Sequence, residues 1–588
     1  MKVLKRILTL ILFASFLCTS SFAQEEPTFF SHIVQRGENL YGISIMYGVS
    51  QEDIIRLNPG CKDKIYAGET IRIPQKKQNN QTFHTIQAGE TLYRLTVKYN
   101  VSAKAICNAN PGLSAENFRI GQVIRIPAPV VEEAPVIEQP IATATPTSNN
   151  IQQAVTPNCR EMHKVKKRET IFSISRLYKI SEQELIAANP EVKNNKLKRG
   201  QWLCIPFKEE KAKPIVERPN MKQPTDQELF ESAETDKLHL QVIRAAILLP
   251  FTHDKRMIEY YEGVLMAVDS LKHSGVNIDL HVYNTDNNPK TIDNILSQQV
   301  MQNMHVIIGP SKSSEIEKVA KFAENHKIRL VIPFSSKEEE VFHNPYVYLV
   351  NTPQSYIYSE VYEHFFRQFH NMNIVFLESK EKTDKKEFIN GLKNELKNRN
   401  ISYKTLYDTS SYEDMDAVTD TTINNIFIPT TGSSICLTRV VPQLAQLTRL
   451  HPTAEIHMFG YPEWQTYTID YLDSFFGLST YFYSSFYTNN LLPAAKNFII
   501  QYRNWYSKEM AMSYPRYGML GFDTSYFFLK GLSLYGTDLE NNLDKMSLKP
   551  IQTGFKFERV NNWGGFINKK VFFVNFSKNY ELIKMDFE

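Results

Sequence analysis

A stretch of roughly 45 residues occurs three times in the first third of this chain, and this repetition constrains the fold more than any other feature. The copies contain "GENLYGISIMYGVSQEDIIRLNPG" from Gly37, "GETLYRLTVKYNVSAKAICNANPG" from Gly89 and "RETIFSISRLYKISEQELIAANPE" from Arg168. In every copy a glutamate precedes an asparagine by 20 residues, as Glu38 precedes Asn58. Such constant spacing is typical of one supersecondary unit that has been duplicated.

Each copy predicts a small βααβ unit. An alternating strand ("SHIVQ", "FHTIQ" or "MHKVK") is followed by a turn, two short helical patterns and a closing strand that ends in Ile-Pro. Leu40, Ile43 and Tyr47 lie on one face of the first helical pattern, as expected of side chains that pack against strands. We call the units repeat 1 (31–75), repeat 2 (83–127) and repeat 3 (158–207).

The order strand, Gly-Glu-Thr-Leu, helix, Val-Ser, Asn-Pro and Ile-x-Ile-Pro resembles the LysM domain. That family binds N-acetylglucosamine-containing glycans, peptidoglycan or chitin, in a shallow groove between the loop after the first strand and the loop before the last. The glycan-binding residues that this resemblance implies are Gly37, Glu38, Asn39, Leu40, Asn58, Pro59, Gly60 and Cys61 in repeat 1; Gly89, Glu90, Thr91, Leu92, Asn110, Pro111, Gly112 and Leu113 in repeat 2; and Glu169, Thr170, Asn189 and Pro190 in repeat 3. Capping of helices and turns is an alternative role for the repeated Glu and Asn.

The cysteines and histidines of the repeats predict a disulfide but no metal site. Cys159 precedes the first strand of repeat 3 and Cys204 lies within its last strand, so an oxidising compartment favours a bridge between them. The other cysteines after the leader, Cys61, Cys107 and Cys436, are expected to be inert buried thiols. One histidine stands in the first strand of each repeat, in a separate unit each time, which does not favour metal binding.

Residues 1–23 predict a secretory signal peptide, because a basic start and an apolar run lead to Ser-Phe-Ala. Lipidation at Cys18 is an open alternative, although Leu17 stands where a small residue is expected. No later apolar run approaches the ~20 residues of a membrane helix. The 67 basic and 63 acidic residues leave a net charge of +4, which does not favour nucleic acid as a partner. We therefore expect an exported protein of the periplasm or cell wall, with no transmembrane segment in the mature chain.

Two segments predict linkers, and the first of them should be extended. Residues 128–157 are rich in Pro, Ala and Thr without periodicity, and residues 208–240 are polar and contain three prolines. From residue 241 to 588 apolar strands alternate with amphipathic helices, which predicts a multidomain α/β chain with a two-lobed, doubly wound parallel-sheet body at its C-terminus. Lobe 1 is expected to comprise residues 242–353 and 488–554, and lobe 2 the remainder.

"YYEGVLMAVDSL", "VIIGPSKSS", "LVIPFSS" and "YGMLGFDTSYFFLKGL" together resemble the type I periplasmic binding protein fold. By that resemblance Ser311, Ser335, Ser336 and Asp523 would hold a small ligand in the cleft between the lobes. The free amides at a helix N-terminus after Gly309-Pro310 suit a carboxylate. The acids in "KEEE" after Ser336 oppose an anionic ligand if they face the cleft, and the serines have the alternative role of helix caps.

No His-Glu-x-x-His, Gly-x-Ser-x-Gly or closely spaced Cys pair appears, so we expect no enzyme, no cofactor and no metal. A glycosidase whose two carboxylates are distant in sequence is the open alternative. The preferred interpretation is a noncatalytic envelope protein whose repeats bind peptidoglycan glycan strands. Its body would bind an envelope protein partner, such as a cell-wall enzyme that it regulates, or a small ligand. The alternative is a periplasmic solute receptor for amino-acid-like ligands.

Overall fold

The computed structural model describes residues 29–62, 65–75, 82–128, 159–167, 169–178, 180, 182–189, 192, 197–206, 224–233, 238–252, 254–286, 290–380, 384–490 and 492–587. The predicted signal peptide, Cys18 and nearly all of the first linker lie outside these residues. The chain divides into two compact units, one formed by residues 1–130 and 224–588 and the other by residues 131–223. Repeats 1 and 2 belong with the C-terminal body in the first unit, whereas repeat 3 lies in the second.

Each repeat has the predicted βααβ order, with its two strands paired antiparallel. The elements are β1 (Phe29–Ile33), α2 (Leu40–Tyr47), α3 (Gln51–Leu57), η1 (Pro59–Lys62) and β2 (Thr70–Pro74) in repeat 1; β3 (Thr82–Thr85), α4 (Leu92–Tyr99), α5 (Ala103–Ala109) and β4 (Val123–Ile126) in repeat 2; and β5 (Cys159–Lys164), α6 (Ile171–Tyr178), α7 (Glu182–Ala187) and β6 (Trp202–Pro206) in repeat 3. Ser50 and Ser102 cap the second helices of repeats 1 and 2.

Lobe 1 is built on a seven-stranded sheet of order β17-β18-β11-β10-β9-β7-β8, in which only β17 runs antiparallel to its neighbour. Its strands are β7 (Ile243–Leu249), β8 (Ile278–Asn284), β9 (Val306–Ile308), β10 (Arg329–Ile332), β11 (Val347–Leu349), β17 (Phe557–Arg559) and β18 (Phe566–Asn568). Its helices are α9 (Lys255–His273), α10 (Thr291–Leu296), η3 (Gln299–Asn303), α11 (Ser313–His326), η4 (Glu339–Phe342), α18 (Tyr517–Tyr535) and η6 (Gly536–Lys545). Lobe 1 therefore reaches residue 568, and the expected end at Gly554 is wrong.

Lobe 2 is a second seven-stranded sheet, of order β13-β12-β14-β15-β16-β19-β20, which is parallel as far as β16. Its strands are β12 (Asn373–Glu378), β13 (Lys404–Tyr407), β14 (Asn425–Pro429), β15 (Ile456–Gly460), β16 (Thr480–Ser484), β19 (Phe572–Phe576) and β20 (Leu582–Asp586). Its helices are α12 (Gln354–Gln368), α13 (Lys386–Asn398), α14 (Tyr412–Val418), α15 (Ser434–Leu450), η5 (Pro462–Thr466) and α16 (Thr468–Gly477), while α17 (Pro493–Tyr506) packs near α9 and α18.

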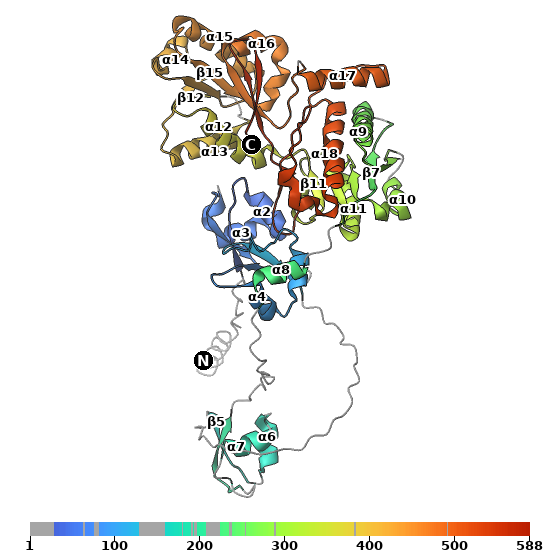
Figure 1. Cartoon of the computed structure of the whole chain (residues 1–588). Coiled ribbons are helices and arrows are strands. Elements are labelled where there is room, and N and C mark those ends of the chain that lie inside the picture. Colours follow the sequence, from blue (N-terminus) through green and yellow to red (C-terminus); the bar gives the residue numbers. More distant parts are fainter. Residues whose placement is uncertain are drawn as a thin grey trace, which may run out of the picture. The chain divides into compact units, whose positions relative to one another are not determined.

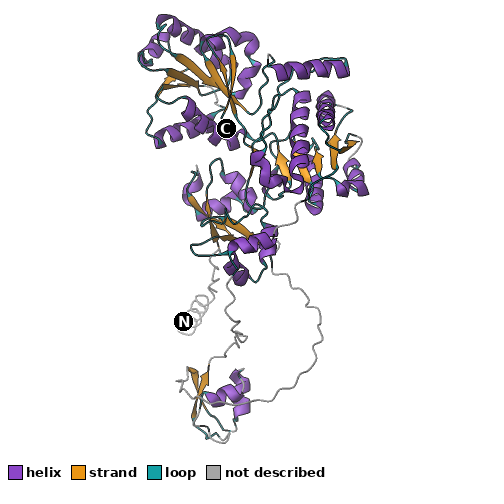
Figure 2. Ribbon diagram, in the orientation of Figure 1, coloured by secondary structure: helices purple, strands orange, loops and turns teal. Residues whose placement is uncertain are grey.

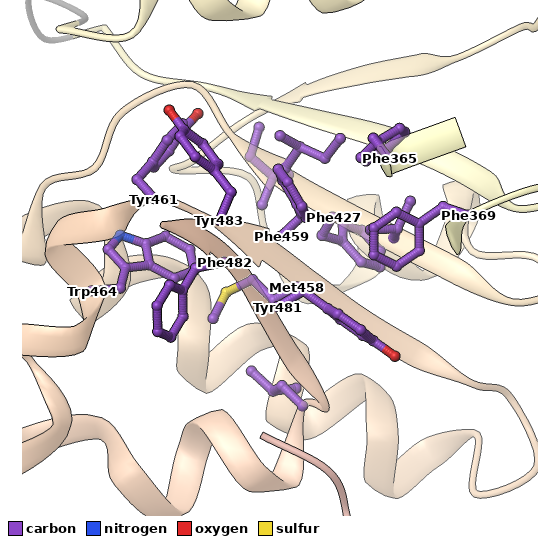
Figure 3. Packing of buried hydrophobic residues seen from close by; sticks show 14 of the residues in the cluster. Phe365, Phe369, Phe427, Met458, Phe459, Tyr461, Trp464, Tyr481, Phe482 and Tyr483 are labelled. Carbon is purple, nitrogen blue, oxygen red and sulfur yellow. The ribbon is translucent and has the colours of Figure 1, made fainter. Parts of the chain in front are cut away.

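Fully buried strands lie at the centre of the lobe sheets. Every residue of β14, β15, β16 and β19 is buried, as expected of strands that are covered on both faces by helices, and Figure 2 shows these sheets between helices. Aromatic side chains dominate the core of lobe 2, where Phe365 and Phe459 meet edge to face with ring centroids 5.2 Å apart (Figure 3). The predicted doubly wound body is thus confirmed, with short antiparallel additions at the edges of both sheets.

The second predicted linker contains a helix over residues 226–233, which its polar composition did not indicate. Helix α8 (Asp226–Ala233) lies against the helices of repeat 2 although more than a hundred residues of chain separate them (Figure 1). Thr225 and Glu228 form a reciprocal capping box, with the Thr225 amide donating to the Glu228 carboxylate at 2.8 Å and the Glu228 amide donating to the Thr225 hydroxyl at 3.3 Å. Phe230 completes the apolar core of repeat 2.

Repeats 1 and 2 pack on each other and on lobe 1. The Thr85 hydroxyl donates to the Ser31 carbonyl at 2.6 Å, and the rings of Phe30 and Phe83 lie 5.4 Å apart. Trp563, in the loop between β17 and β18, is 1% exposed and contacts Tyr47 and Phe83, with ring centroids 5.9 Å and 5.2 Å away. One continuous apolar cluster runs from repeat 1 through this tryptophan to one face of the lobe 1 sheet. The first two repeats therefore share a core with the body.

Candidate functional site

The repeated glutamate is part of a partly buried hydrogen-bonded group in all three repeats. Its carboxylate bonds the Nε2 atom of the strand histidine, at 2.8 Å for His32–Glu38, 2.6 Å for His84–Glu90 and 2.9 Å for His163–Glu169. The same carboxylate accepts a backbone N–H from the turn, and the Nδ1 atom of the histidine bonds a tyrosine hydroxyl of the first helix; the turn residues are Gln35, Gln87 and Lys166 and the tyrosines Tyr47, Tyr99 and Tyr178. The glutamate thus holds the turn that precedes the first helix.

Hydrogen bonds around Glu90 keep its carboxylate ionised. Burial acts to raise the pKa of Glu90, but hydrogen bonds from the Gln87 amide, Lys98 and His84 outweigh burial and lower it to about 2. Burial lowers the pKa of His84, with Glu90 acting in the opposite direction. A carboxylate whose lone pairs are committed in this way stabilises the fold.

The repeated asparagine also bonds within its own repeat. In repeat 1 the Asn58 Nδ2 atom donates to the Ile54 and Arg72 carbonyls at 2.8 Å and 2.7 Å, and its Oδ1 atom accepts from the Arg72 amide at 2.9 Å. The same three bonds recur for Asn110 with Ile106 and Arg125, and for Asn189 with Leu185 and Cys204. The asparagine side chain therefore connects the second helix to the closing strand. The groups that remain on these loops for a ligand are largely backbone amides and carbonyls.

Residue by residue, repeat 1 presents one covered loop and one open loop. In the first loop Asn39 caps α2 by accepting from the Gly42 amide at 2.7 Å, Leu40 is half-buried, and Gly37 adopts a φ of 84°. In the second, Pro59 and Gly60 are exposed, whereas the Cys61 thiol is buried. Cys61 and Cys107 are free thiols. Cys61 and Cys436 are buried, as predicted, whereas Cys107 is only half-buried, so the prediction is wrong for that residue.

Side chains of the body cover the first loop of repeat 1. A Cβ added at Gly37 would lie 3.5 Å from the Tyr356 carbonyl oxygen, and Arg36 forms an ion pair with Glu363 at 2.6 Å. Tyr41 donates to Glu339. A cavity of about 210 Å³ remains here, lined by Gln35, Arg36, Gly37, Glu38, Gly42 and Met46 of repeat 1 and by Phe342, Tyr356, Arg559, Val560, Ile567 and Lys569 of the body.

In repeat 2 both groove loops contact other parts of the chain. The Leu92 amide donates to the Asp226 carboxylate of α8 at 2.8 Å, beside Thr91, which caps α4. In the second loop the Gly112 amide donates to the Asn562 carbonyl at 2.8 Å. Gly89 and Pro111 are exposed and Leu113 is buried. The sequence pattern of "TDQE" signals the start of α8, but nothing in the pattern indicated where that helix packs.

Repeat 3 has two exposed aromatic side chains. Thr170 and Ser173 cap each other's amides at 3.1 Å and 2.8 Å, and Glu169 bonds His163 as described above. Phe172 and Trp202 are 54% and 53% exposed. Pro190 and the side chain of Cys159 lie outside the described residues, so the Cys159–Cys204 bridge stays a prediction.

The predicted cleft residues bond to the chain itself. The Ser335 hydroxyl donates to Glu338 at 2.5 Å, and Ser313 donates to the same carboxylate at 2.7 Å. Ser311 and Ser336 are half-buried nearby in sequence. Glu338, an acid of the "KEEE" run, thus already accepts the hydroxyl hydrogen bonds that a carboxylate ligand would require.

Asp523, the fourth predicted cleft residue, holds a distant segment of the chain. Its carboxylate accepts from the amides of Ile551, Gln552 and Thr553, each at 2.8 Å. Burial raises its pKa to about 6, against the lowering effect of these three bonds. These contacts give Asp523 a structural role, and a ligand role for it stays a prediction.

Among the described residues, no group of three or more His, Cys, Asp or Glu side chains is arranged to hold a metal ion. No helix within that part of the chain has the length and apolar character needed to cross a membrane.

Comparisons with known proteins match the two parts of the chain separately. The model of the LysM domain matches residues 32–74, 84–127 and 163–206, and the model of the receptor family ligand binding region matches residues 260–432. The chain is 27% identical over 174 residues to the Probable N-acetylmuramoyl-L-alanine amidase AmiB of Haemophilus influenzae, covering 30% of this chain and 32% of that protein. It is 31% identical over 93 residues to the Cell wall-binding protein YocH of Bacillus subtilis, covering 16% and 32%. The chain thus spans about a third of the length of these relatives.

Among solved structures, an ABC transporter substrate-binding protein from Desulfitobacterium hafniense in complex with Leu is 13% identical, with a TM-score of 0.33, covering 58% of this chain and 100% of that one. An ABC transporter substrate-binding protein from Sphaerobacter thermophilus is 11% identical, with a TM-score of 0.35, covering 59% and 97%.

Proposed function

The chain contains three LysM domains and a C-terminal domain of the periplasmic-binding-protein type, and on this premise we propose that it is an exported, noncatalytic protein that binds the N-acetylglucosamine glycan of the cell wall. The LysM match of all three repeats carries the proposal. The amidase and the cell wall-binding protein named above, which match over short regions, support the same location. The two-lobed body would then be held at the wall, where it meets an envelope protein partner such as a cell-wall enzyme that it regulates.

Loops built from glycine and Asn-Pro turns suit this chemistry, because acetamido groups need backbone donors and acceptors that approach closely. A single shallow groove binds weakly, and several on one chain gain by effective concentration only if each is open to the polymer.

Sedimentation with purified peptidoglycan sacculi tests the proposal. We expect the full chain without residues 1–23 to pellet with sacculi and to be released by soluble N-acetylglucosamine oligosaccharides, whereas cellulose should not retain it. If the protein stays in the supernatant at all sacculus concentrations, wall binding is wrong.

The alternative, a solute receptor for amino-acid-like ligands, rests on the fold of the body alone. The Glu338 carboxylate on Ser335 and Ser313 disfavours an anionic ligand at that place, because two carboxylates would compete for the same donors. Calorimetry of the full chain with an amino-acid panel decides this point, since the alternative requires measurable heat at millimolar ligand.

A further inference from the structure

The cavity of about 210 Å³ beside the first loop of repeat 1 lies between that repeat and both lobes of the body. We propose that it binds a primary ammonium group of the cell-wall polymer, with the Glu38 carboxylate and the Gly37 carbonyl as acceptors. This inference rests on the proposed wall binding and names a chemical group that the binding would recognise. The comparison of repeat 1 with repeat 2 of the same chain points to this chemistry.

In repeat 2 two cationic side chains cover the turn before the first helix. The Lys98 ammonium donates to the Oε1 atom of Glu90 at 3.0 Å, and the Arg94 guanidinium donates to the Gly89 carbonyl at 2.8 Å. Hydrogen bonds from ionised donors are shorter and stronger than those between neutral groups. The turn thus presents two oxygen acceptors, and the chain itself supplies a cation for each of them.

Repeat 1 lacks both cations. Met46 stands at the position of Lys98 and Gly42 at the position of Arg94, 52 residues earlier in each case. Both of these residues line the cavity. Tyr356 of α12 closes the space above Gly42, because a Cβ added there would lie 2.6 Å from the tyrosine hydroxyl. The cavity of repeat 1 therefore lies where repeat 2 has its lysine and arginine side chains.

The corresponding acceptor residues of repeat 1, Gly37 and Glu38, also line the cavity. The Oε2 atom of Glu38 bonds His32 and a turn amide, as in the other repeats. Within the part of the chain that the structure describes, no hydrogen-bond donor reaches the Oε1 atom of Glu38 or the carbonyl of Gly37. The Glu38 side chain is only 12% exposed, so a hydrogen bond to it would form largely away from bulk water, where it is stronger.

Three cationic side chains also line the cavity, and each already has a partner. The pairs are Arg36 with the Glu363 carboxylate at 2.6 Å, Lys569 with the Glu558 carboxylate at 3.0 Å, and Arg559 with the Gly564 carbonyl at 2.5 Å. Glu38 has a histidine and an amide as partners but, among the residues described, no lysine or arginine. A bound ammonium group would give Glu38 the cation that Glu90 has in Lys98.

The remaining walls suit the tip of an amine-bearing side group. The rings of Phe342 and Tyr356 have centroids 6.2 Å apart, and aromatic faces attract ammonium groups. The cavity is smaller than the roughly 300–1,000 Å³ of pockets that enclose a whole drug-sized ligand. We therefore expect the tip of a side group, and no complete sugar chain, to enter it.

Primary amines occur in two places in a cell-wall polymer, on the diamino acid of a stem peptide and on glucosamine that carries no acetyl group. Both present an ammonium ion with N–H donors at neutral pH, and N-acetylation removes the charge from either one. The shared chemistry is the ammonium group, and matched probes distinguish its two sources.

Calorimetry of the full chain without residues 1–23 tests the ammonium requirement. One pair of probes is a diaminopimelate-containing stem tripeptide and its N-acetylated form, and the other is the glucosamine trisaccharide and the N-acetylglucosamine trisaccharide. We expect one free amine to bind at least tenfold more tightly than its acetylated counterpart, and the pair that shows this difference identifies the source. Equal affinities within both pairs overturn the inference.

The substitution Met46→Lys locates the amine site within the chain. The new ammonium would bond Glu38 as Lys98 bonds Glu90, so we expect the preference for the free amine to fall below twofold. Met46→Leu, of similar size and without charge, is the matched control and should keep the preference of the parent. A preference that survives Met46→Lys would place the amine elsewhere and contradict the inference.

Pelleting of the parent chain with sacculi needs no variant and separates this inference from the proposed function. We expect N-acetylation of the sacculi with acetic anhydride to weaken binding at least threefold without abolishing it, because the N-acetylglucosamine groups are unchanged. Equal binding to both kinds of sacculi would show that the ammonium site is wrong while wall binding holds. If the chain pellets with neither, the proposed wall binding itself is wrong.

Discussion

At the scale of single residues, the repeated Glu and Asn turn out to be occupied by the fold. The carboxylate of Glu90 bonds a histidine, a turn amide and Lys98, and the carboxamide of Asn110 bonds three backbone groups of a helix and a strand. Buried polar groups that are satisfied so fully stabilise a local conformation and leave few atoms for a ligand. Of the two alternatives that the sequence allowed for these residues, capping and glycan contact, the hydrogen bonds favour the structural one.

The Glu90 carboxylate gives a prediction about pH. Its folded pKa of about 2 lies below the ordinary value of about 4.5, so its ionised form stabilises repeat 2 above pH 4.5, and that contribution is lost as the pH falls towards 2. We expect Glu90→Gln to weaken repeat 2 by roughly 1–3 kcal/mol at pH 7. Hydrogen-exchange protection of residues 84–99, compared between variant and parent at each pH, measures the effect.

The difference between parent and Glu90→Gln should shrink steadily from pH 4.5 to pH 2. Glu52→Gln, an exposed carboxyl in repeat 1, is the control and should leave protection unchanged at every pH. A difference that is constant across this range would show that the charge of Glu90 does not contribute.

At the scale of elements, α8 shows how a segment that looks like a linker becomes part of a domain. Its eight residues carry two neighbouring large apolar side chains, Leu229 and Phe230, and a capping box lies at the start. An isolated helix of this length is not stable in water, so its order depends on the groove of repeat 2. The same docking places Asp226 on the Leu92 amide.

Removing the Phe230 ring should therefore release α8. We expect Phe230→Ala to cost roughly 3–5 kcal/mol at this contact and to expose residues 224–233 to protease while lobes 1 and 2 stay folded. Limited proteolysis with mass mapping is the measurement. Glu231→Gln, on the exposed side of the same helix, should be cleaved no faster than the parent, and equal resistance of Phe230→Ala would show that packing on repeat 2 does not hold the helix.

At the scale of the whole first unit, two repeats and lobe 1 are joined through Trp563. Small βααβ units bury little area by themselves, and a shared core supplies what they lack. In this arrangement repeats 1 and 2 contribute to the stability of the first unit, and this contribution does not involve a glycan.

A substitution at this junction should uncouple its parts. We expect Trp563→Ala to lower the stability of the junction by about 3–5 kcal/mol and to split calorimetric unfolding, with repeats 1 and 2 melting before the lobes. Trp505→Ala is the matched control, because that ring is 49% exposed on α17. A thermogram of Trp563→Ala that matches the parent in shape and midpoint would show that the repeats do not depend on the junction.

The sequence alone was sufficient for the three repeats, their βααβ order and the doubly wound body, because each depends on local periodicity and on the spacing of turns within a few dozen residues. Two features were not predicted: strands β17 and β18 belong to the lobe 1 sheet, and the second linker contains a helix. Both depend on partners that lie far away along the chain, such as β11 for β18 and repeat 2 for α8. No local pattern records which distant surface a strand or helix will meet.

The same distinction applies to the candidate site. Sequence patterns predicted which loops would form each LysM groove, and that assignment stays a prediction. Only the tertiary structure decided what those loops touch: Asn562 and Asp226 stand 450 and 134 residues after Gly112 and Leu92, respectively, and meet them only in the folded chain. Occupancy of a groove is a property of packing between distant segments, and packing is set by the shapes and charges of surfaces that exist only in the folded chain.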